Sequence, residues 1–187
     1  MKLNLGCGYN YRPDWINADI APDCNPDVLM DMERFPWPFP DSSFHEVAIN
    51  HALEHVGQLP ETYLAVIREL YRVCAHQAKV IITVPHPRHE QYLIDPTHVR
   101  PIMPESFLMF SQEINRTIIA DKGSDSPLGL RNGVDFVTEA IHYHLDPVWE
   151  DRRNRGEIND EQLQAALRSQ NNVVDFYTVI LKVVKPG

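Results

Sequence analysis

The stretch Lys2-Leu-Asn-Leu-Gly-Cys-Gly8 (KLNLGCG, residues 2–8) joins a short, mostly apolar segment to two closely spaced glycines. Residues 2–5 suit a strand, and Gly6 and Gly8 follow it directly. Because glycine has no Cβ, it lets the backbone pass close to a bound group. In an open parallel sheet, ligands lie beyond the carboxyl ends of the strands. The stretch therefore predicts the first strand of an α/β domain, with a ligand-binding turn at its end.

More strand-like segments follow this turn, and prolines separate them. Residues 15–20 and 28–32 are predicted as short strands, each with an acid near its end. The other predicted strands are residues 46–50, 79–84, 136–145 and 173–184. A helix is predicted to begin at Pro60. Its expected buried face consists of Leu64, Ile67, Leu70, Tyr71 and Cys74. Strands alternating with crossovers are typical of a parallel α/β sheet, here of about seven strands.

The later part of the chain contains two further helix signals. Residues 104–112 are predicted as a short helix. Asn159, with Gln162 three residues later, has the pattern of a capping box at the start of another helix. The pattern assigns no role to residues 113–135.

Composition narrows the class of protein. The 187 residues correspond to one domain, and 17 Lys and Arg against 26 Asp and Glu give a net charge of −9. Such an acidic chain is a poor candidate for binding nucleic acid or anionic membranes. Three irregularly spaced cysteines predict neither a disulfide framework nor a zinc site. Without a long apolar run or a signal-peptide pattern, the protein is expected to be soluble and cytoplasmic.

Two acids follow the next two predicted strands and complete a possible nucleoside site. Asp19 is placed to accept hydrogen bonds from both hydroxyls of a ribose, and Asp31 is placed to meet an adenine beyond it. Three alternatives stay open. The glycines can form only a tight turn, Asp19 can cap a loop, and Asp31 can be a solvated loop acid.

Several segments resemble the class I S-adenosylmethionine-dependent methyltransferases, especially those that act on small molecules. They are LNLGCG (3–8), NADI (17–20), DM (31–32), FPDSSFHEVAINHALEHV (39–56) and ITVPHP (82–87). The stretch DPTHVRP (95–101), followed by PESF (104–107), is also similar to a segment of many of these enzymes. The resemblance covers roughly residues 1–110. It implies a Rossmann-like sheet of strand order 3-2-1-4-5-7-6 with the last strand antiparallel.

The resemblance also implies how the chain is divided and which residues bind the cofactor. Residues 1–187 form one domain, with 1–85 as the cofactor half and 86–187 as the acceptor-side half. The implied S-adenosylmethionine contacts are Leu5, Gly6, Cys7 and Gly8 at the methionine part, Asp19 and Ile20 at the ribose, Asp31 and Met32 at the adenine, and Asn50 and His51 near the sulfonium. Glu54 and His55 belong to the motif, but we expect them to tie the following helix to the sheet.

One departure from the family pattern concerns the glycine turn. Asn10 stands where the third glycine is usual, and only residues 9–15, interrupted by Pro13, separate Gly8 from the second strand. The first helix is therefore expected to be shortened, which weakens its dipole beside the ligand. This disfavours NAD, whose pyrophosphate depends on that helix N-terminus. The carboxylate of S-adenosylmethionine can instead be held by Arg12 or by backbone amides.

Histidines are frequent in the half of the chain expected to bind the acceptor: His86, His89, His98, His142 and His144. No carboxylate cluster with recognisable spacing accompanies them, so no metal site is predicted, and most are expected to be solvated or to anchor loops. The catalytic candidates are His98, as a base or an orienting group, and Arg100, for an acidic acceptor. They lie on a stretch stiffened by Pro96 and Pro101 that is suited to a lid. Alternatively, its charged residues only shape the loop.

Together these features predict an enzyme that transfers a methyl group from S-adenosylmethionine to a small-molecule acceptor. Such a reaction requires alignment of the reactants and exclusion of water, and removal of a proton where the acceptor carries one. The alternative is a non-catalytic module that binds an adenosyl nucleoside. An NAD or nucleotide-sugar enzyme is disfavoured by the glycine pattern. Neither the acceptor nor the oligomeric state is indicated.

Overall fold

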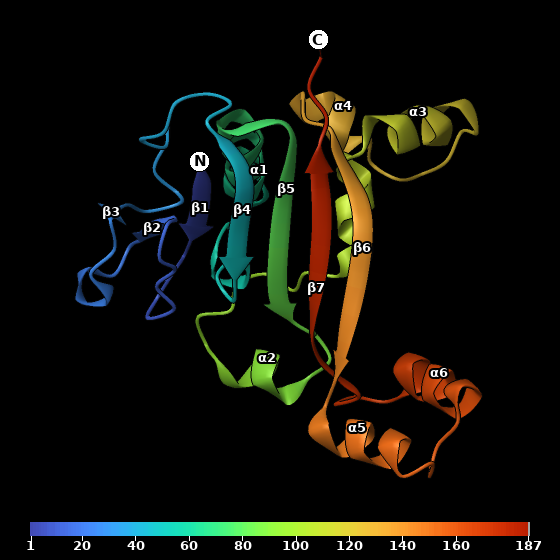
Figure 1. Cartoon of the computed structure of the whole chain (residues 1–187). Helices are drawn as coiled ribbons and strands as arrows, with labels where there is room; N and C mark the ends of the chain where they lie inside the picture. The colour runs from blue at the N-terminus through green and yellow to red at the C-terminus, as the bar shows by residue number, and fades with distance from the viewer. Residues whose placement is uncertain (187) are drawn as a thin grey trace.

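The computed structural model describes residues 1–186 and contains a seven-stranded sheet (Figure 1). Its strands are β1 (Lys2–Leu5), β2 (Ile16–Asp19), β3 (Val28–Leu29), β4 (Phe44–Asn50), β5 (Cys74–Pro85), β6 (Phe136–Leu145) and β7 (Val174–Val183). They are arranged in the order β3-β2-β1-β4-β5-β7-β6. Strands β1 to β5 pair in parallel, and β7 is antiparallel to both β5 and β6. The predicted strand order and the antiparallel last strand are confirmed.

The helical segments are mostly short. They are the 3-10 turns η1 (Pro22–Cys24), η2 (Leu53–His55) and η3 (Pro104–Phe110), and the helices α1 (Pro60–Val73), α2 (Glu90–Ile94), α3 (Gln112–Ala120), α4 (Leu128–Asn132), α5 (Pro147–Asn154) and α6 (Asp160–Ser169). In residues 1–186, none has the length and apolar character of a membrane-crossing helix. The Asn159 capping box is confirmed at the start of α6. The helix expected over 104–112 is instead the 3-10 turn η3, and Ser111 caps a separate helix, α3.

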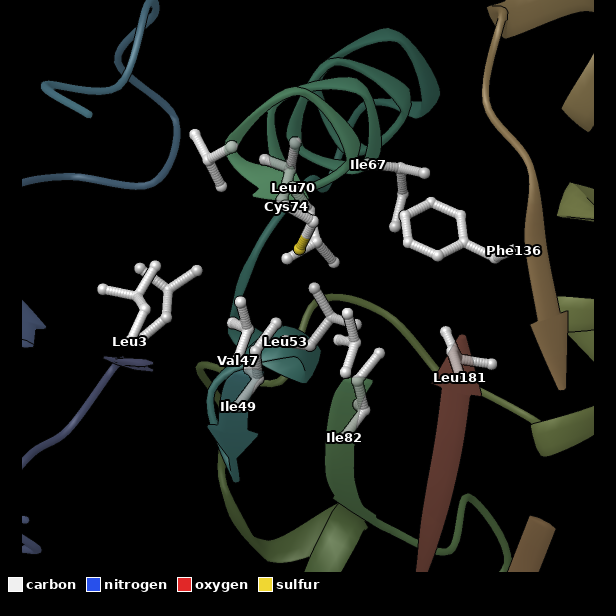
Figure 2. Close-up of a cluster of buried hydrophobic side chains, with 14 of the residues drawn as sticks. Leu3, Val47, Ile49, Leu53, Ile67, Leu70, Cys74, Ile82, Phe136 and Leu181 are labelled. Carbon is white, nitrogen blue, oxygen red and sulfur yellow. The ribbon is translucent and has the colours of Figure 1, made fainter. Parts of the chain in front are cut away.

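Helix α1 begins at Pro60, as predicted, and presents an apolar face to the sheet. Its buried side chains are Tyr63, Val66, Ile67, Leu70 and Val73, while Leu64 and Tyr71 are partly buried. Cys74 is also buried but already belongs to β5. Figure 2 shows Ile67 and Leu70 above side chains of β4, β5 and β7. Each such buried side chain contributes roughly 1.5–3 kcal/mol. This packing holds the strands whose ends carry the site.

Helix α1 covers one face of the central strands. Figure 1 shows α4 on the same side, whereas α2, α5 and α6 lie beyond the lower end of the strands, and none of the helices of residues 1–186 that it labels crosses the opposite face of β4, β5 and β7. Along β7, buried residues such as Val179 and Leu181 alternate with partly exposed Thr178 and Ile180. Doubly wound sheets normally carry helices on both faces. Here residues 6–15, between β1 and β2, and residues 20–27, between β2 and β3, are too short to supply such helices.

The predicted shortening of the first helix is complete, because residues 6–15 contain turns and no helix. A buried polar network holds this connection instead. The Asn4 side-chain amide donates to Asn17 Oδ1 (2.9 Å) and to the Asn10 carbonyl (2.8 Å), and that of Asn17 donates to Asp27 Oδ2 (2.9 Å). Hydrogen bonds from Asn17, that of its backbone N–H first, lower the pKa of Asp27. Since buried amides are costly unless they are hydrogen-bonded, the network makes the connection specific.

Candidate functional site

A cavity of about 470 Å³ lies at the carboxyl ends of β1, β2 and β4. This volume is within the range of small-molecule sites, roughly 300–1,000 Å³. The residues that line it are Leu5, Gly6, Gly8, Ala18, Asp19, Ile20, Met30, Asp31, Met32, Glu33, His51, Ala52, His55 and Val56. The cavity is therefore where the sequence placed a ligand, beyond the glycine turn.

Most of the predicted cofactor residues lie in the wall of this cavity. Cys7 and Asn50 do not. Cys7 is buried, and burial first, then the charge of Asp19, raises the pKa of its thiol. Asn50 is the last residue of β4, paired with Thr83 of β5. Six further residues of the wall were not predicted: Ala18, Met30, Glu33, Ala52, His55 and Val56. Each is close in sequence to a predicted contact, which was the available signal.

The turn after β1 is fastened to the end of β2. The amides of Gly6 and Cys7 both donate to the Ala18 carbonyl, at 2.8 and 3.1 Å. Gly8 donates to Asp19 Oδ2 at 2.7 Å, and Asp19 Oδ1 accepts from the Ala21 amide at 2.9 Å. A carboxylate has about four acceptor positions, so two remain for ribose hydroxyls. Capping the loop and binding a ligand are thus compatible roles for Asp19.

The groups suggested for the ligand's carboxylate are occupied elsewhere. The three amides of the glycine turn are paired within the protein. The guanidinium of Arg12 lies over the Trp15 ring, 4.8 Å from its centroid, and Arg12 is not among the residues of the cavity wall.

The two glycines of the turn serve different purposes. Both have a left-handed backbone, with φ of 68° at Gly6 and 49° at Gly8. A Cβ on Gly6 would lie 2.4 Å from the Ala52 Cβ, whereas a Cβ on Gly8 would meet no atom within 4 Å. Gly6 is therefore required for the close approach of β1 to the segment after β4. Gly8 borders the cavity and leaves space there.

Replacing Gly6 with alanine should destabilise the protein by about 2–5 kcal/mol, the sum of the clash and of the left-handed backbone. Urea unfolding measures this change. The double variant Gly6→Ala with Ala52→Gly should recover the part due to the clash, about 1–3 kcal/mol. If the stability changes of the two substitutions are strictly additive, the contact with Ala52 is not the reason that position 6 requires glycine.

The charge of the cavity wall is negative. Asp19, Asp31 and Glu33 contribute carboxylates, and no lining residue is Lys or Arg. Asp31 Oδ1 accepts from the Glu33 amide at 2.8 Å, and Glu33 Oε1 accepts from the Gly57 amide at 2.7 Å, so backbone groups hold both carboxylates in place. Such a wall favours a cationic ligand and disfavours a pyrophosphate.

The predicted catalytic residues His98 and Arg100 are not among the residues of this wall. The Arg100 side chain donates through Nε to the Gly57 carbonyl at 3.0 Å, and its guanidinium lies 4.3 Å from the centroid of the Tyr63 ring. It borders a different cavity, of about 290 Å³. These contacts anchor the 95–101 loop, in agreement with the alternative that its charged residues shape the loop. The catalytic roles of His98 and Arg100 stay predictions.

His98 lies behind His55, which does line the cavity. The two rings are 4.6 Å apart, and His98 also stacks on Tyr92 at 5.0 Å. The loop is tied down because the Glu54 carbonyl accepts the amides of Val99 and Arg100, at 2.9 and 3.1 Å. The Glu54 backbone thus ties η2 to the 95–101 loop, which is a different link from the expected one between the following helix and the sheet.

The remaining histidines lie elsewhere. His86 and His89 are buried after β5; burial lowers the pKa of His86, and His89 Nε2 is 3.2 Å from Asp146 Oδ2. His142 and His144 are exposed on β6, where His144 stacks on Phe176. None of these four lines the cavity at the glycine turn.

Comparison with known proteins identifies the fold. No protein-family model matches the chain, and no curated protein sequence matches it. Solved structures do. A SAM-dependent methyltransferase from Archaeoglobus fulgidus is similar over 97% of this chain and 85% of its own, with a TM-score of 0.62 at 20% identity. An S-adenosylmethionine-dependent methyltransferase from Mesorhizobium loti is similar over 97% and 90%, with a TM-score of 0.51 at 15% identity.

A third similar structure, the [4+2]-cyclase SpnF, matches over 99% of this chain and 75% of its own, with a TM-score of 0.55 at 13% identity. At these identities the comparisons establish the fold. Together with the strand order and the antiparallel β7, they show that the chain has the Rossmann-like fold of the class I S-adenosylmethionine-dependent methyltransferases.

Proposed function

We propose that this protein transfers a methyl group from S-adenosylmethionine to a small-molecule acceptor. The observation that carries the proposal is the acidic cavity at the glycine turn, in the fold shared with S-adenosylmethionine-dependent methyltransferases. Its wall combines free acceptor positions on Asp19 with a lack of Lys and Arg among the lining residues. This suits a ligand with a sulfonium and an ammonium group better than one with phosphates.

The roles proposed for the wall follow the chain from β1 to β4. Leu5 and Gly8 border the methionine part, Asp19 accepts from the ribose, and Asp31 and Met32 border the adenine. When bound, S-adenosylmethionine supplies a methyl group already activated by its sulfonium. The protein therefore has to align the acceptor, exclude water and accept a proton where the acceptor loses one.

Calorimetry with three ligands tests the cofactor assignment. We expect S-adenosylmethionine and S-adenosylhomocysteine to bind, and NAD to bind at least about 100-fold more weakly, because its pyrophosphate would face carboxylates without a helix N-terminus. Equal or tighter binding of NAD would contradict the proposal.

Methyl transfer itself is tested by the release of S-adenosylhomocysteine in the presence of pooled small-molecule acceptors. Acceptor-dependent release supports an enzyme. Tight binding without release from any pool would favour the non-catalytic module. The net charge of −9 supports a small acceptor over nucleic acid or an anionic membrane, and the three free cysteines are consistent with a reducing compartment such as the cytoplasm.

A further inference from the structure

Two neighbouring side chains and a third that is distant in sequence converge beside the cofactor cavity. Glu54 and His55 belong to η2, and His98 belongs to the loop after α2. One potential ligand atom from each of these three side chains lies within 4.8 Å of the others. We propose that Glu54, His55 and His98 form a binding site for a divalent transition-metal ion of the zinc and iron class.

The Glu54 carboxylate is the first reason. The residue is 1% exposed, and its Oε2 has no hydrogen-bond partner among the described residues. The nearest ionisable partner of Oε1 is His51, whose Nδ1 is 3.7 Å away, too far for a hydrogen bond. A buried carboxylate without hydrogen bonds is costly, and a cation bound beside it removes that cost.

The orientation of the two imidazole rings is the second reason. His98 Nδ1 is 2.7 Å from the Tyr92 carbonyl, which can only accept, so Nδ1 carries the hydrogen. His55 Nδ1 is 2.9 Å from Thr97 Oγ1, and the Thr97 hydroxyl donates to Asp95 Oδ1 at 2.6 Å, so Thr97 accepts from His55. In the neutral rings, both Nε2 atoms therefore keep their lone pairs. Metal-binding histidines are oriented in this way by a partner on the other nitrogen.

The spacing also fits coordination better than hydrogen bonding. No nitrogen of His55 or His98 lies within 4.0 Å of a Glu54 oxygen, as an ion pair would require. Atoms bound about 2.1 Å from one tetrahedral zinc ion lie about 3.4 Å apart. Because the three candidate atoms lie within 4.8 Å of one another, the side chains need to close by up to about 1.4 Å when the ion binds. Asp95 Oδ2 lies 3.9 Å from His98 Nε2.

The ligand set determines the class of ion. Two imidazoles and one carboxylate are typical of zinc and of non-haem iron(II), whereas magnesium and calcium prefer oxygen ligands. Three protein ligands leave coordination positions open, and His55 connects the site to the cofactor cavity. Metal binding here does not depend on methyl transfer, so either proposal can fail alone.

Titration of chelator-treated protein with Zn²⁺, followed by calorimetry, tests the site. We expect one ion per chain. Glu54→Gln and His98→Ala should each weaken binding by at least about 100-fold, because even loss of an outer partner costs 10–100-fold. Thr97→Val, which removes the acceptor that orients His55, should weaken it by about 10–100-fold. The control is His142→Ala, which removes an exposed histidine on β6 and should leave the affinity unchanged.

Two readouts separate coordination from loss of folding. Co²⁺ in place of zinc should give visible absorption bands that His98→Ala alters, and Zn²⁺ should raise the Tm of the wild type but not that of Glu54→Gln. Chelator-treated Glu54→Gln should be at least as stable as the wild type, since a neutral amide replaces an unpaired buried charge. Absence of stoichiometric binding, or equal affinity in the wild type, Glu54→Gln and His98→Ala, would overturn the proposal.

Discussion

Replacement of Gly8 with valine is expected to abolish S-adenosylmethionine binding while the protein remains folded. Gly8 lines the cavity, and a Cβ at this position meets no protein atom within 4 Å, so the new side chain would occupy space meant for the ligand. The φ of 49° adds a stability cost of roughly 1–2 kcal/mol. Calorimetry should show an affinity loss of more than about 100-fold, or about 2.8 kcal/mol.

Gly156 offers a matched control for this variant. It also has a left-handed backbone, with φ of 69°, and a Cβ there likewise meets no atom within 4 Å, but it lies just after α5 and does not line the cavity. Gly156→Val should therefore carry a similar strain and keep the affinity for S-adenosylmethionine. Retained binding in Gly8→Val would mean that the turn after β1 does not contact the ligand. An equal loss of affinity in Gly8→Val and Gly156→Val would show that the effect comes from lowered stability.

Asp19→Ala should remain folded and bind S-adenosylmethionine about 10- to 150-fold more weakly. Hydrogen bonds to a charged group contribute roughly 1.5–3 kcal/mol each, and loss of even one accounts for that range. A second contribution to the loss of affinity comes from the turn itself, because Asp19 also accepts hydrogen bonds from the Gly8 and Ala21 amides that shape it. Calorimetry gives the affinity, and thermal unfolding gives the stability of the same variant.

The variant Asp27→Ala separates the loss of hydrogen bonds to the ligand from the loss of hydrogen bonds within the protein. Asp27 likewise accepts hydrogen bonds from its neighbours, two of them from Asn17, but does not line the cavity. Its loss should lower the Tm and leave the affinity of the folded protein within a few-fold of the wild type. Unchanged affinity in Asp19→Ala would contradict the ribose assignment.

Local sequence was sufficient for most of the sheet. A short, continuous apolar run such as residues 79–84 predicts a buried strand, because side chains on both faces of such a strand pack in the interior. The boundaries of two strands differ most from the prediction. Residues 28–32 were predicted as a strand, but β3 ends at Leu29. Strand β5 begins at Cys74, directly after α1, because Cys74 pairs with Phe44 ahead of a bulge. Pairing of this kind depends on a distant strand and leaves no local pattern.

The glycine turn shows a similar division. Both glycines were predicted to approach a ligand, since one sequence pattern describes them both. Only the packed structure distinguishes them, because Gly6 faces Ala52 across the space between two segments and Gly8 faces the cavity. For Arg100, likewise, the charge was visible in the sequence, but its position over Tyr63 depends on α1.

By itself, the sequence determined the α/β class, the turn after β1 and most of the cavity wall, because these depend on short runs of residues at the ends of strands. Tertiary structure alone decided that Glu54, His55 and His98 converge. Their convergence requires the loop after α2 to return to η2, where the Glu54 carbonyl accepts the Val99 and Arg100 amides. Hydrogen bonds between residues more than 40 positions apart depend on the packing of the whole chain, so no local pattern in the sequence predicts them.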